Sequence, residues 1–396
     1  MERLVREAAL RGATSVRVWL TDESAAAGAR AQRADLARLY DMATGFELVA
    51  DNGSLYDELG QTRESVLLLE GDAIYDDRIL TFLLAGNSDS VVSTPDGVAA
   101  AFVSPAGARR VARARAESGP NDRSLAALAR RARLQVRGPQ DLPEYVPSLR
   151  LTLRAFAVRL GEPGQVRAVE NLMFRRTFKG VIDAVAKYGY YHIVRSITRV
   201  LARTALTPNL LTLSSIIGIW AAVPSFAAGL LGAGVVAAWA GVILDSVDGK
   251  LARLTLHLSD AMGALEHVTA AVGLVLWFAA LGWHFTGGGL LRGGPLAMAT
   301  WALIAACVLD KMVSGLFRRQ FGRELFDYRP IDAVFHLVAA RRNAHLLLLS
   351  LGVLAGRAEL AFVGMAAWMV ITLVFHLVRW SWATLAREAD AVAGPD

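Results

Sequence analysis

The sequence predicts two different domains in one chain: an N-terminal α/β domain and a C-terminal polytopic, all-α membrane domain of six transmembrane helices. Hydrophobic residues make up 54% of the 396 residues, and the mean hydropathy is +0.38, which is more apolar than is usual for a soluble enzyme. Strand-like and helix-like segments alternate in the first half, whereas apolar runs of transmembrane length fill the second. We place the α/β domain at residues 1–145, a linker with an amphipathic helix at 146–205, and the membrane domain at 206–396.

Charge and cysteine content narrow the class of protein further. The net charge is +6, and arginines gather near the apolar runs, which favours contact with anionic lipid headgroups. No basic patch with interleaved aromatic residues is present, so we expect no nucleic-acid partner. The single cysteine, Cys307, excludes an intramolecular disulfide. Because Met1-Glu-Arg-Leu lacks the apolar core of a signal peptide, we expect the N-terminal part to stay in the cytosol.

The first part of the chain reads as alternating helices and strands, which is typical of an α/β sheet. We expect helices at 2–11, 25–44 and 76–84, and strands at 15–20, at 66–69 and from Val91 onward.

One strand in this part resembles a known nucleotide-binding element. The run Val66 to Asp72 resembles the strand of sugar nucleotidyltransferases whose last aspartate holds the catalytic metal, and 101–105 resembles a later strand of the same family. That family's Gly-rich loop, which cradles a triphosphate, would precede the first helix, but this chain starts at that helix. We therefore expect a truncated domain without nucleotidyl transfer, in which Asp72 is a loop residue at a strand end.

A basic segment separates the two domains. Residues 106–165 are rich in arginine and interrupted by prolines, and we interpret them as a helical, partly extended linker. Residues 171–205 combine basic and aromatic side chains, which predicts an amphipathic helix lying on the membrane surface. The alternative is an amphipathic helix packed on the soluble domain.

Six apolar runs define the membrane domain, and we expect spans at 208–228, 230–249, 263–284, 295–317, 342–356 and 358–379. Thr207-Pro208-Asn209 opens the first, where proline suits a helix start. Lysines and arginines concentrate in the loops after the second, fourth and sixth spans. The positive-inside rule then places both termini in the cytosol, in a protein of the inner or cytoplasmic membrane.

The chemistry centres on Asp245-Ser-Val-Asp248-Gly249-Lys-Leu-Ala252-Arg253, which follows the second apolar run. Its five named residues share one helical face. Carboxylates at i and i+3 suit a hard cation such as Mg²⁺ or Mn²⁺. The glycine and alanine leave room for a ligand, and the arginine can fork onto a phosphate. The alternative, a solvated helix end with incidental ion pairs, is disfavoured because charges near a bilayer are costly.

Charged residues elsewhere in the spans add two further candidates. Arg341 and Arg342, at the start of the fifth span, form a candidate phosphate clamp, or else part of the positive-inside cluster. Asp310 and Lys311 lie within the fourth span, where they either face a cavity or form a structural ion pair.

The stretch from Asp245 to Arg253 resembles the first half of the CDP-alcohol phosphotransferase motif, D-x2-D-G-x2-A-R, at every defined position. The second half, G-x3-D-x3-D, departs from the family. Gly263 is in place, but His267 and Ala271 stand where the family has its third and fourth aspartates, and Glu266 is next to His267.

The resemblance implies a reaction in which a CDP-alcohol binds through its diphosphate on two metal ions, the hydroxyl of an acceptor alcohol or lipid attacks the β-phosphorus, and CMP leaves. It also implies a homodimer. Carried over residue by residue, Asp245 and Asp248 are metal ligands, and Asn209, Gly249, Ala252 and Arg253 bind the substrate. To these we add candidates from the departures and from the charge pattern: Glu266 and His267 as catalytic residues, His267 as a further metal ligand, and Arg341 and Arg342 as substrate-binding residues.

The altered second half leaves three outcomes open. Glu266 and His267 substitute for the lost aspartates, one as ligand and the other as base. Or the site holds one metal and acts slowly. Or the protein is a pseudoenzyme that binds a nucleotide-lipid or acts as a membrane scaffold. A transporter is disfavoured, because the sequence has no inverted repeat and no matching pair of broken spans.

Overall fold

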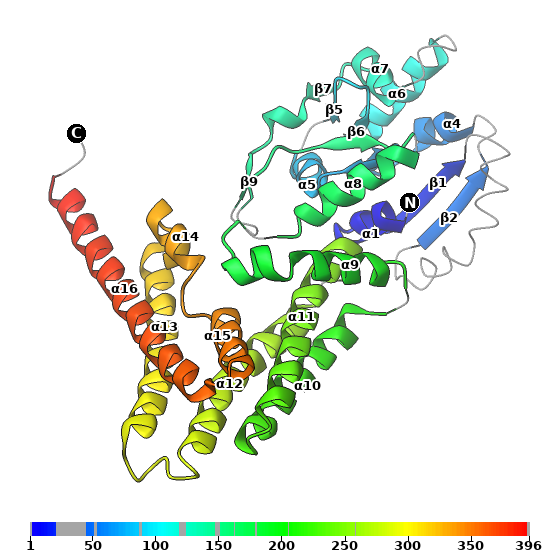
Figure 1. Ribbon diagram of the computed structural model, residues 1–396. Coiled ribbons are helices and arrows are strands. Elements are labelled where there is room, and N and C mark those ends of the chain that lie inside the picture. Colours follow the sequence, from blue (N-terminus) through cyan, green and yellow to red (C-terminus); the bar gives the residue numbers. More distant parts are fainter. Residues whose placement is uncertain are drawn as a thin grey trace. The chain divides into compact units, whose positions relative to one another are not determined.

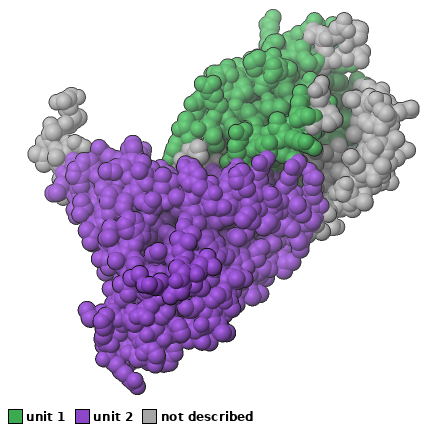
Figure 2. Space-filling view, in the orientation of Figure 1, with its two compact units in different colours: residues 1–176 green, residues 177–396 purple. Residues whose placement is uncertain are grey.

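The chain divides into two compact units, unit 1 (Met1–Arg176) and unit 2 (Thr177–Asp396), which are coloured separately in Figure 2. Each unit has its own set of helices, and the ten strands found among the described residues belong to unit 1 (Figure 1). The computed structural model describes residues 2–20, 45–50, 54–86, 89–118, 124–146, 151–161, 163–178, 180–204, 206–257 and 259–393. The helix expected at 25–44 lies outside these residues.

Unit 1 is an α/β structure, as the alternating pattern predicts. Its main sheet has the strand order β3-β6-β5-β7, in which β6 runs antiparallel to β3 and β5, and β7 runs parallel to β5. Its strands are β3 (Val66–Leu69), β5 (Ser90–Ser93), β6 (Ala99–Val103) and β7 (Gln135–Arg137). The strands expected at 66–69 and from Val91 are thus confirmed, within one residue for the second.

The remaining strands form three pairs. These are parallel β1 (Ser15–Leu20) with β2 (Gly45–Ala50), antiparallel β4 (Ala73–Tyr75) with β10 (Ala157–Arg159), and antiparallel β8 (Tyr145–Val146) with β9 (Leu151–Thr152). Because β10 pairs with β4, the first part of the segment assigned to the linker at 146–205 belongs to unit 1.

Helices cover both faces of the main sheet. The helices of unit 1 are α1 (Glu2–Leu10), α4 (Ser54–Gln61), α5 (Asp77–Ala85), α6 (Pro105–Ala116), α7 (Leu125–Arg131) and α8 (Pro163–Arg175), with a short 3-10 turn at Pro139–Asp141. Val91 and Ala101 pack with buried residues of α4, α6 and α7, whereas Val92 and Ala100 pack with residues of α1 and α5. Alternate strand residues therefore fill two cores, one on each face. Helices α6 and α7 lie almost wholly within residues 106–165, which the sequence suggested as a linker. They supply one of these cores, because residues such as Ala108, Val111 and Leu128 are buried.

The described secondary-structure elements of unit 2 are all helical. Its elements are a π-helical turn (Val185–Gly189), α9 (Tyr191–Leu201), α10 (Pro208–Ala227), α11 (Leu231–Thr255), α12 (Asp260–Phe285), α13 (Pro295–Phe321), a 3-10 turn (Leu325–Asp327), α14 (Pro330–His336), α15 (Arg342–Leu354) and α16 (Ala358–Ala393).

Five of these helices, namely α10, α11, α12, α13 and α16, are long and apolar enough to cross a membrane. The fifth expected span, at 342–356, is not confirmed, and so neither is the total of six. At that place α15 has 13 residues, and at about 1.5 Å per residue it is about 20 Å long, whereas the hydrocarbon core is about 30 Å thick.

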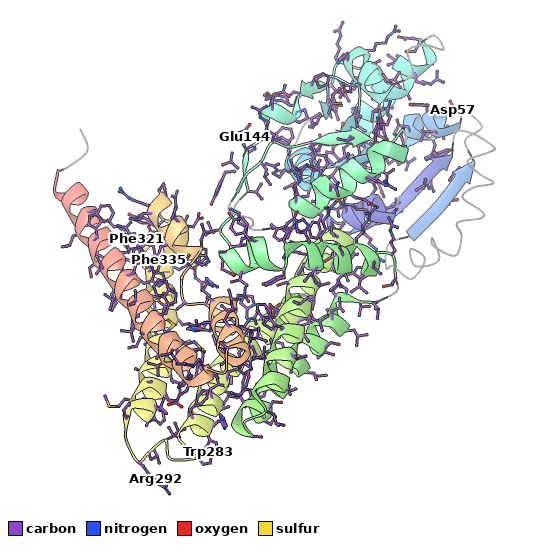
Figure 3. All side chains as sticks on the ribbon, viewed as in Figure 1. Asp57, Glu144, Trp283, Arg292, Phe321 and Phe335 are labelled. Carbon is purple, nitrogen blue, oxygen red and sulfur yellow. The ribbon has the colours of Figure 1, made fainter. Side chains whose placement is uncertain are left out.

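Aromatic and basic side chains gather at the ends of the long helices, as is typical of membrane–water boundaries. Trp283 and Arg292 lie at the connection between α12 and α13, at the opposite end of α13 from Phe321 (Figure 3). At the end that holds Phe321, the guanidinium of Arg329 stacks over the Trp382 ring at 4.5 Å.

The amphipathic segment before the first span is α9, which contacts α11. Val194 and Thr198 are buried, whereas Ile193 and Val200 are 50% and 63% exposed. The exposed apolar side chains suit a helix at a membrane surface, and that placement stays a prediction.

Asp310 and Lys311, the adjacent charged residues within α13, have different surroundings. Asp310 Oδ1 lies 2.5 Å from His376 Nδ1 of α16, while Lys311 is exposed. The contact between Asp310 and His376 therefore joins α13 to α16, and the sequence analysis missed His376.

Helices α10 and α11 touch backbone to backbone. A Cβ atom added at Gly218 would lie 2.8 Å from the backbone N of Gly241, and one added at Gly241 would lie 2.7 Å from the backbone N of Ile219. Both distances are too short for real carbon atoms, so these glycines bring the two helices close together. The approach sets the position of the aspartates further along α11.

Gly241→Ala is therefore expected to destabilise the protein by about 1–3 kcal/mol, because the new methyl group must push the helices apart. Thermal unfolding in detergent, followed by tryptophan fluorescence, measures the change. Gly232→Ala on the same helix is the control, since no atom lies within 4 Å of its added Cβ. Equal melting temperatures for the two variants would show that the close approach contributes nothing.

Candidate active site

The stretch from Asp245 to Arg253 lies inside α11, not at its end. The helix continues to Thr255 and stops where Leu256 adopts a left-handed conformation with φ of 59°. The residues after Gly249, namely Lys250, Leu251, Ala252 and Arg253, are good helix formers, so the helix extends beyond the expected end at 249. We call the shared helical face of Asp245, Asp248, Gly249, Ala252 and Arg253 the motif face, and it lies within a continuous helix.

Asp248 is buried and fully engaged. Its residue is only 2% exposed. Oδ2 accepts a hydrogen bond from Thr212 Oγ1 of α10 at 2.7 Å, and Oδ1 accepts from the backbone N–H of Gly249 at 2.5 Å. The close packing of α10 on α11 brings Thr212 to this carboxylate. The sequence analysis missed Thr212. The sequence feature that could have pointed to Thr212 is its place on the first apolar helix, one turn after Pro208.

Asp245 is paired on one side only. Its Oδ2 accepts a hydrogen bond from Arg342 Nη2, the first residue of α15, at 2.5 Å. Its Oδ1 is buried and receives no hydrogen bond from an N–H group or a hydroxyl of the described residues. A buried carboxylate oxygen without a donor is costly, so this atom is a natural ligand for a cation.

Glu266 of α12 joins this group. Its carboxyl lies within hydrogen-bonding reach of Asp245 and close enough to interact electrostatically with Asp248 and Arg342. The side chain of Glu266 is 23% exposed, whereas that of the adjacent His267 is 79% exposed and its Nδ1 lies 4.0 Å from Glu266 Oε1. The structure thus brings Glu266 to the aspartates and leaves His267 outside. The catalytic role predicted for both, and the metal role predicted for His267, stay predictions.

Arg253 lies along the motif face of α11. A Cβ added at Gly249 would come 3.5 Å from Arg253 Nη1, an ordinary contact, so the guanidinium passes over the glycine. Arg253 Nε is buried and has no hydrogen-bond partner among the described residues. Ala252 is half-buried beside it, and Asn209 is exposed on the first turn of α10.

The two arginines of the candidate clamp diverge. Arg342 binds Asp245, whereas Arg341 Nη1 lies 3.1 Å from His336 Nε2, and its guanidinium is 5.9 Å from the centre of the Phe326 ring. Only Arg342 therefore lies with the carboxylates.

A second polar group, largely missed by the sequence analysis, holds the start of α15. Asn343 Nδ2 donates to Asp183 Oδ2 at 2.8 Å and to the Tyr190 hydroxyl at 2.9 Å, and Ser246 Oγ donates to the same hydroxyl at 3.3 Å. Burial raises the pKa of Tyr190 to about 12, so its hydroxyl is neutral at physiological pH. We call Asp183, Tyr190 and Asn343 the α15 anchor.

The carboxylates fit a divalent cation by donor type, since Asp245, Asp248 and Glu266 offer only oxygens and one of these is buried without a donor. In their present conformations, however, no three His, Cys, Asp or Glu side chains of the described chain are close enough to hold a metal ion together. Arg342 instead occupies one oxygen of Asp245. The last motif position, Ala271, offers no ligand.

Comparisons with known proteins add little to this geometry. No protein-family model matches the chain, and no curated protein matches it. One similar solved structure is the phosphatidylinositol phosphate synthase of Mycobacterium tuberculosis with CDP-DAG bound, at 22% identity and a TM-score of 0.37, covering 48% of this chain and 94% of that chain. The same enzyme in complex with manganese and citrate matches at 21% identity and a TM-score of 0.36, covering 47% and 88%. At these identities and TM-scores, neither structure supports an assignment of family, ligand or reaction to this chain.

Proposed function

We propose that unit 2 is an integral membrane phosphotransferase that moves a phosphoalcohol from a CDP-alcohol to an acceptor alcohol or lipid and releases CMP. One observation carries the proposal. Asp245, Asp248 and Glu266 come together from two helices of an apolar bundle, and a buried oxygen of Asp245 has no N–H or hydroxyl donor among the described residues. The complete match of residues 245–253 to the first half of the family motif supports it. Two acids with an unsatisfied oxygen serve no obvious structural purpose within apolar helices.

A divalent cation, Mg²⁺ or Mn²⁺, would be held by Asp245 and Asp248 and would neutralise charge on the diphosphate. Gly249 would let the nucleotide lie against the helix backbone. Arg253 and Arg342 would contact phosphate oxygens, since a guanidinium can donate two parallel hydrogen bonds to a phosphate.

Glu266 would accept the proton of the attacking hydroxyl. In that step a bond forms between the acceptor oxygen and the β-phosphorus, the bond from that phosphorus to the CMP oxygen breaks, and the proton passes to the Glu266 carboxylate. The proposal includes cytosolic termini in an inner or cytoplasmic membrane, from the arginine distribution, and a homodimer, from the resemblance. A metal role for His267 would require its exposed ring to turn inward.

One observation favours a second candidate. Ala271 stands at the final motif position, and His267 is turned away from the aspartates. A protein that binds a CDP-alcohol without turnover, and acts as a pseudoenzyme or scaffold, would have these features. Turnover separates the two candidates, because only the enzyme releases CMP.

The test is CMP release by the purified full chain in detergent, supplied with a panel of CDP-alcohols, acceptor alcohols and Mn²⁺ or Mg²⁺. We expect metal-dependent release that Gly249→Ala reduces by about 10- to 100-fold. The nearest atom to the added Cβ is 3.5 Å away, so the variant folds, but its methyl group occupies the space proposed for the nucleotide. Gly315→Ala is the control, since no atom lies within 4 Å of its added Cβ. Binding of CDP-alcohols without CMP release would favour the pseudoenzyme, and absence of both would refute the proposal.

A further inference from the structure

Arg342 supplies a positive charge beside the carboxylates of Asp245 and Glu266. Its Nη2 donates to Asp245 Oδ2 at 2.5 Å, and the side chains of Arg342 and Asp245 are only 20% and 13% exposed. Glu266 interacts electrostatically with the same guanidinium. A divalent cation bound to Asp245 would therefore meet a positive charge already in place, and the two cations compete for one carboxylate.

The backbone of Arg342 is held independently of this ion pair. The next residue, Asn343, donates to both Asp183 and Tyr190 of the α15 anchor. Asp183 is itself fixed, because its Oδ1 accepts from the Ala186 backbone N–H at 2.9 Å. Two further contacts secure the surroundings, from the Ala184 N–H to the Leu337 carbonyl at 2.7 Å and from Trp239 Nε1 of α11 to Ser350 Oγ of α15 at 2.9 Å. Only the flexible side chain of Arg342 is then free to change partner.

We propose that Arg342 is an exchangeable counter-ion. It neutralises Asp245 while no divalent cation is bound, and it turns to a phosphate of the anionic ligand when a cation takes its place on Asp245. The identity of that anion as a nucleoside diphosphate rests on the proposed function; the exchange itself rests on the ion pair and the α15 anchor.

The exchange makes metal and anion binding cooperative. A metal ion that displaces Arg342 frees a guanidinium for the anion, and an anion that holds Arg342 away from Asp245 leaves a better site for the metal. Thermodynamic linkage requires the two effects to be equal. A fixed structural ion pair would give no such coupling, and its removal would weaken the metal site or leave it unchanged.

The experiment titrates Mn²⁺ against the full chain in detergent, with free Mn²⁺ measured by electron paramagnetic resonance, in the absence and presence of CDP. Protein-free titrations correct for the Mn²⁺–CDP complex. Without CDP, Arg342→Gln is expected to bind Mn²⁺ about tenfold more tightly than the wild type, because the competing charged hydrogen bond is gone. With CDP, the wild type tightens its Mn²⁺ binding and Arg342→Gln does not.

Two controls separate exchange from general damage. Arg341→Gln removes the same charge one residue earlier, where the guanidinium contacts His336 and Phe326 and not Asp245, so its Mn²⁺ affinity is expected to match that of the wild type. Arg342→Lys keeps the competing charge and is expected to remain near the wild type without CDP. Thermal unfolding provides a second readout, in which Mn²⁺ raises the melting temperature of Arg342→Gln more than that of the wild type.

Mn²⁺ affinity in Arg342→Gln that is equal to or weaker than in the wild type would overturn the exchange, even if CMP release is observed. Conversely, the expected affinities with no CMP release from any CDP-alcohol would leave the exchange standing and refute the enzymatic function. A wild type that binds no Mn²⁺ would refute both.

Discussion

Asp245→Asn and Asp248→Asn are each expected to reduce metal-dependent CMP release by at least about 10²-fold, the largest effect on activity that we anticipate. Asparagine keeps the shape of the side chain but loses the charge that a hard cation requires. In Asp245→Asn the buried Arg342 also loses its counter-ion, and in Asp248→Asn the amide nitrogen competes with the N–H and O–H donors that now point at the carboxylate. Initial rates of CMP release measure both.

The matched control is Asp310→Asn, which removes a carboxylate from α13 that pairs with His376 and takes no part in the proposed site. Its rate is expected to stay near that of the wild type. Comparison of Glu266→Gln with His267→Ala then tells which of the two serves the reaction, and the position of Glu266 beside Asp245 favours a large loss for Glu266→Gln alone. Unchanged rates in both aspartate variants would exclude Asp245 and Asp248 from catalysis.

In unit 1, Asp76→Ala is expected to destabilise the structure around α5 by about 3–5 kcal/mol, the typical result of removing one partner from a buried ion pair. Asp76 is 4% exposed and caps α5. Its carboxylate accepts from Arg78 Nε and Nη2, both at 2.8 Å, and from Arg176 Nη1 at 2.5 Å. Removing the carboxylate leaves both guanidinium groups without their shared partner.

Hydrogen–deuterium exchange of peptides from β4 and α5 in the full chain measures this effect, because it reports the local free energy of opening. A loss of about 3–5 kcal/mol corresponds to protection lower by more than 10²-fold. Asp57→Asn is the control, since Asp57 is exposed on α4 and its loss is expected to cost less than about 1 kcal/mol. Equal protection in the two variants would contradict the buried-pair argument.

The same pair has a defined pH dependence. Burial alone would raise the pKa of Asp76, but the hydrogen bonds and charge of Arg78 outweigh burial and hold that pKa below its usual value. A lowered folded-state pKa means that the ionised carboxylate stabilises the folded state above the unfolded pKa, and that this contribution is lost as the pH falls. The difference between wild type and Asp76→Ala is therefore expected to be full near pH 7 and to shrink below about pH 4.

The sequence by itself determined those features that depend on local periodicity. The alternation of helix-like and strand-like segments predicted an α/β unit, and long apolar runs predicted the membrane-type helices. The i, i+3 spacing of Asp245 and Asp248 predicted a shared helical face, because helix geometry relates near neighbours without reference to the rest of the chain. The predicted end of the second span, at 249, fell short of the observed end of α11 at Thr255, since helix ends depend on contacts as well as on propensity.

Tertiary structure alone decided which distant side chains meet. Arg342 reaches Asp245 across 97 positions, and Asn343 reaches Asp183 across 160, pairings that no local pattern encodes. Glu266 and His267 were equal candidates in the sequence, and the rotation of about 100° between helical neighbours turned one toward Asp245 and the other away. The length of the helix near 342–356 was also decided in three dimensions: this apolar run folds into a 13-residue helix, which is shorter than the thickness of a bilayer core.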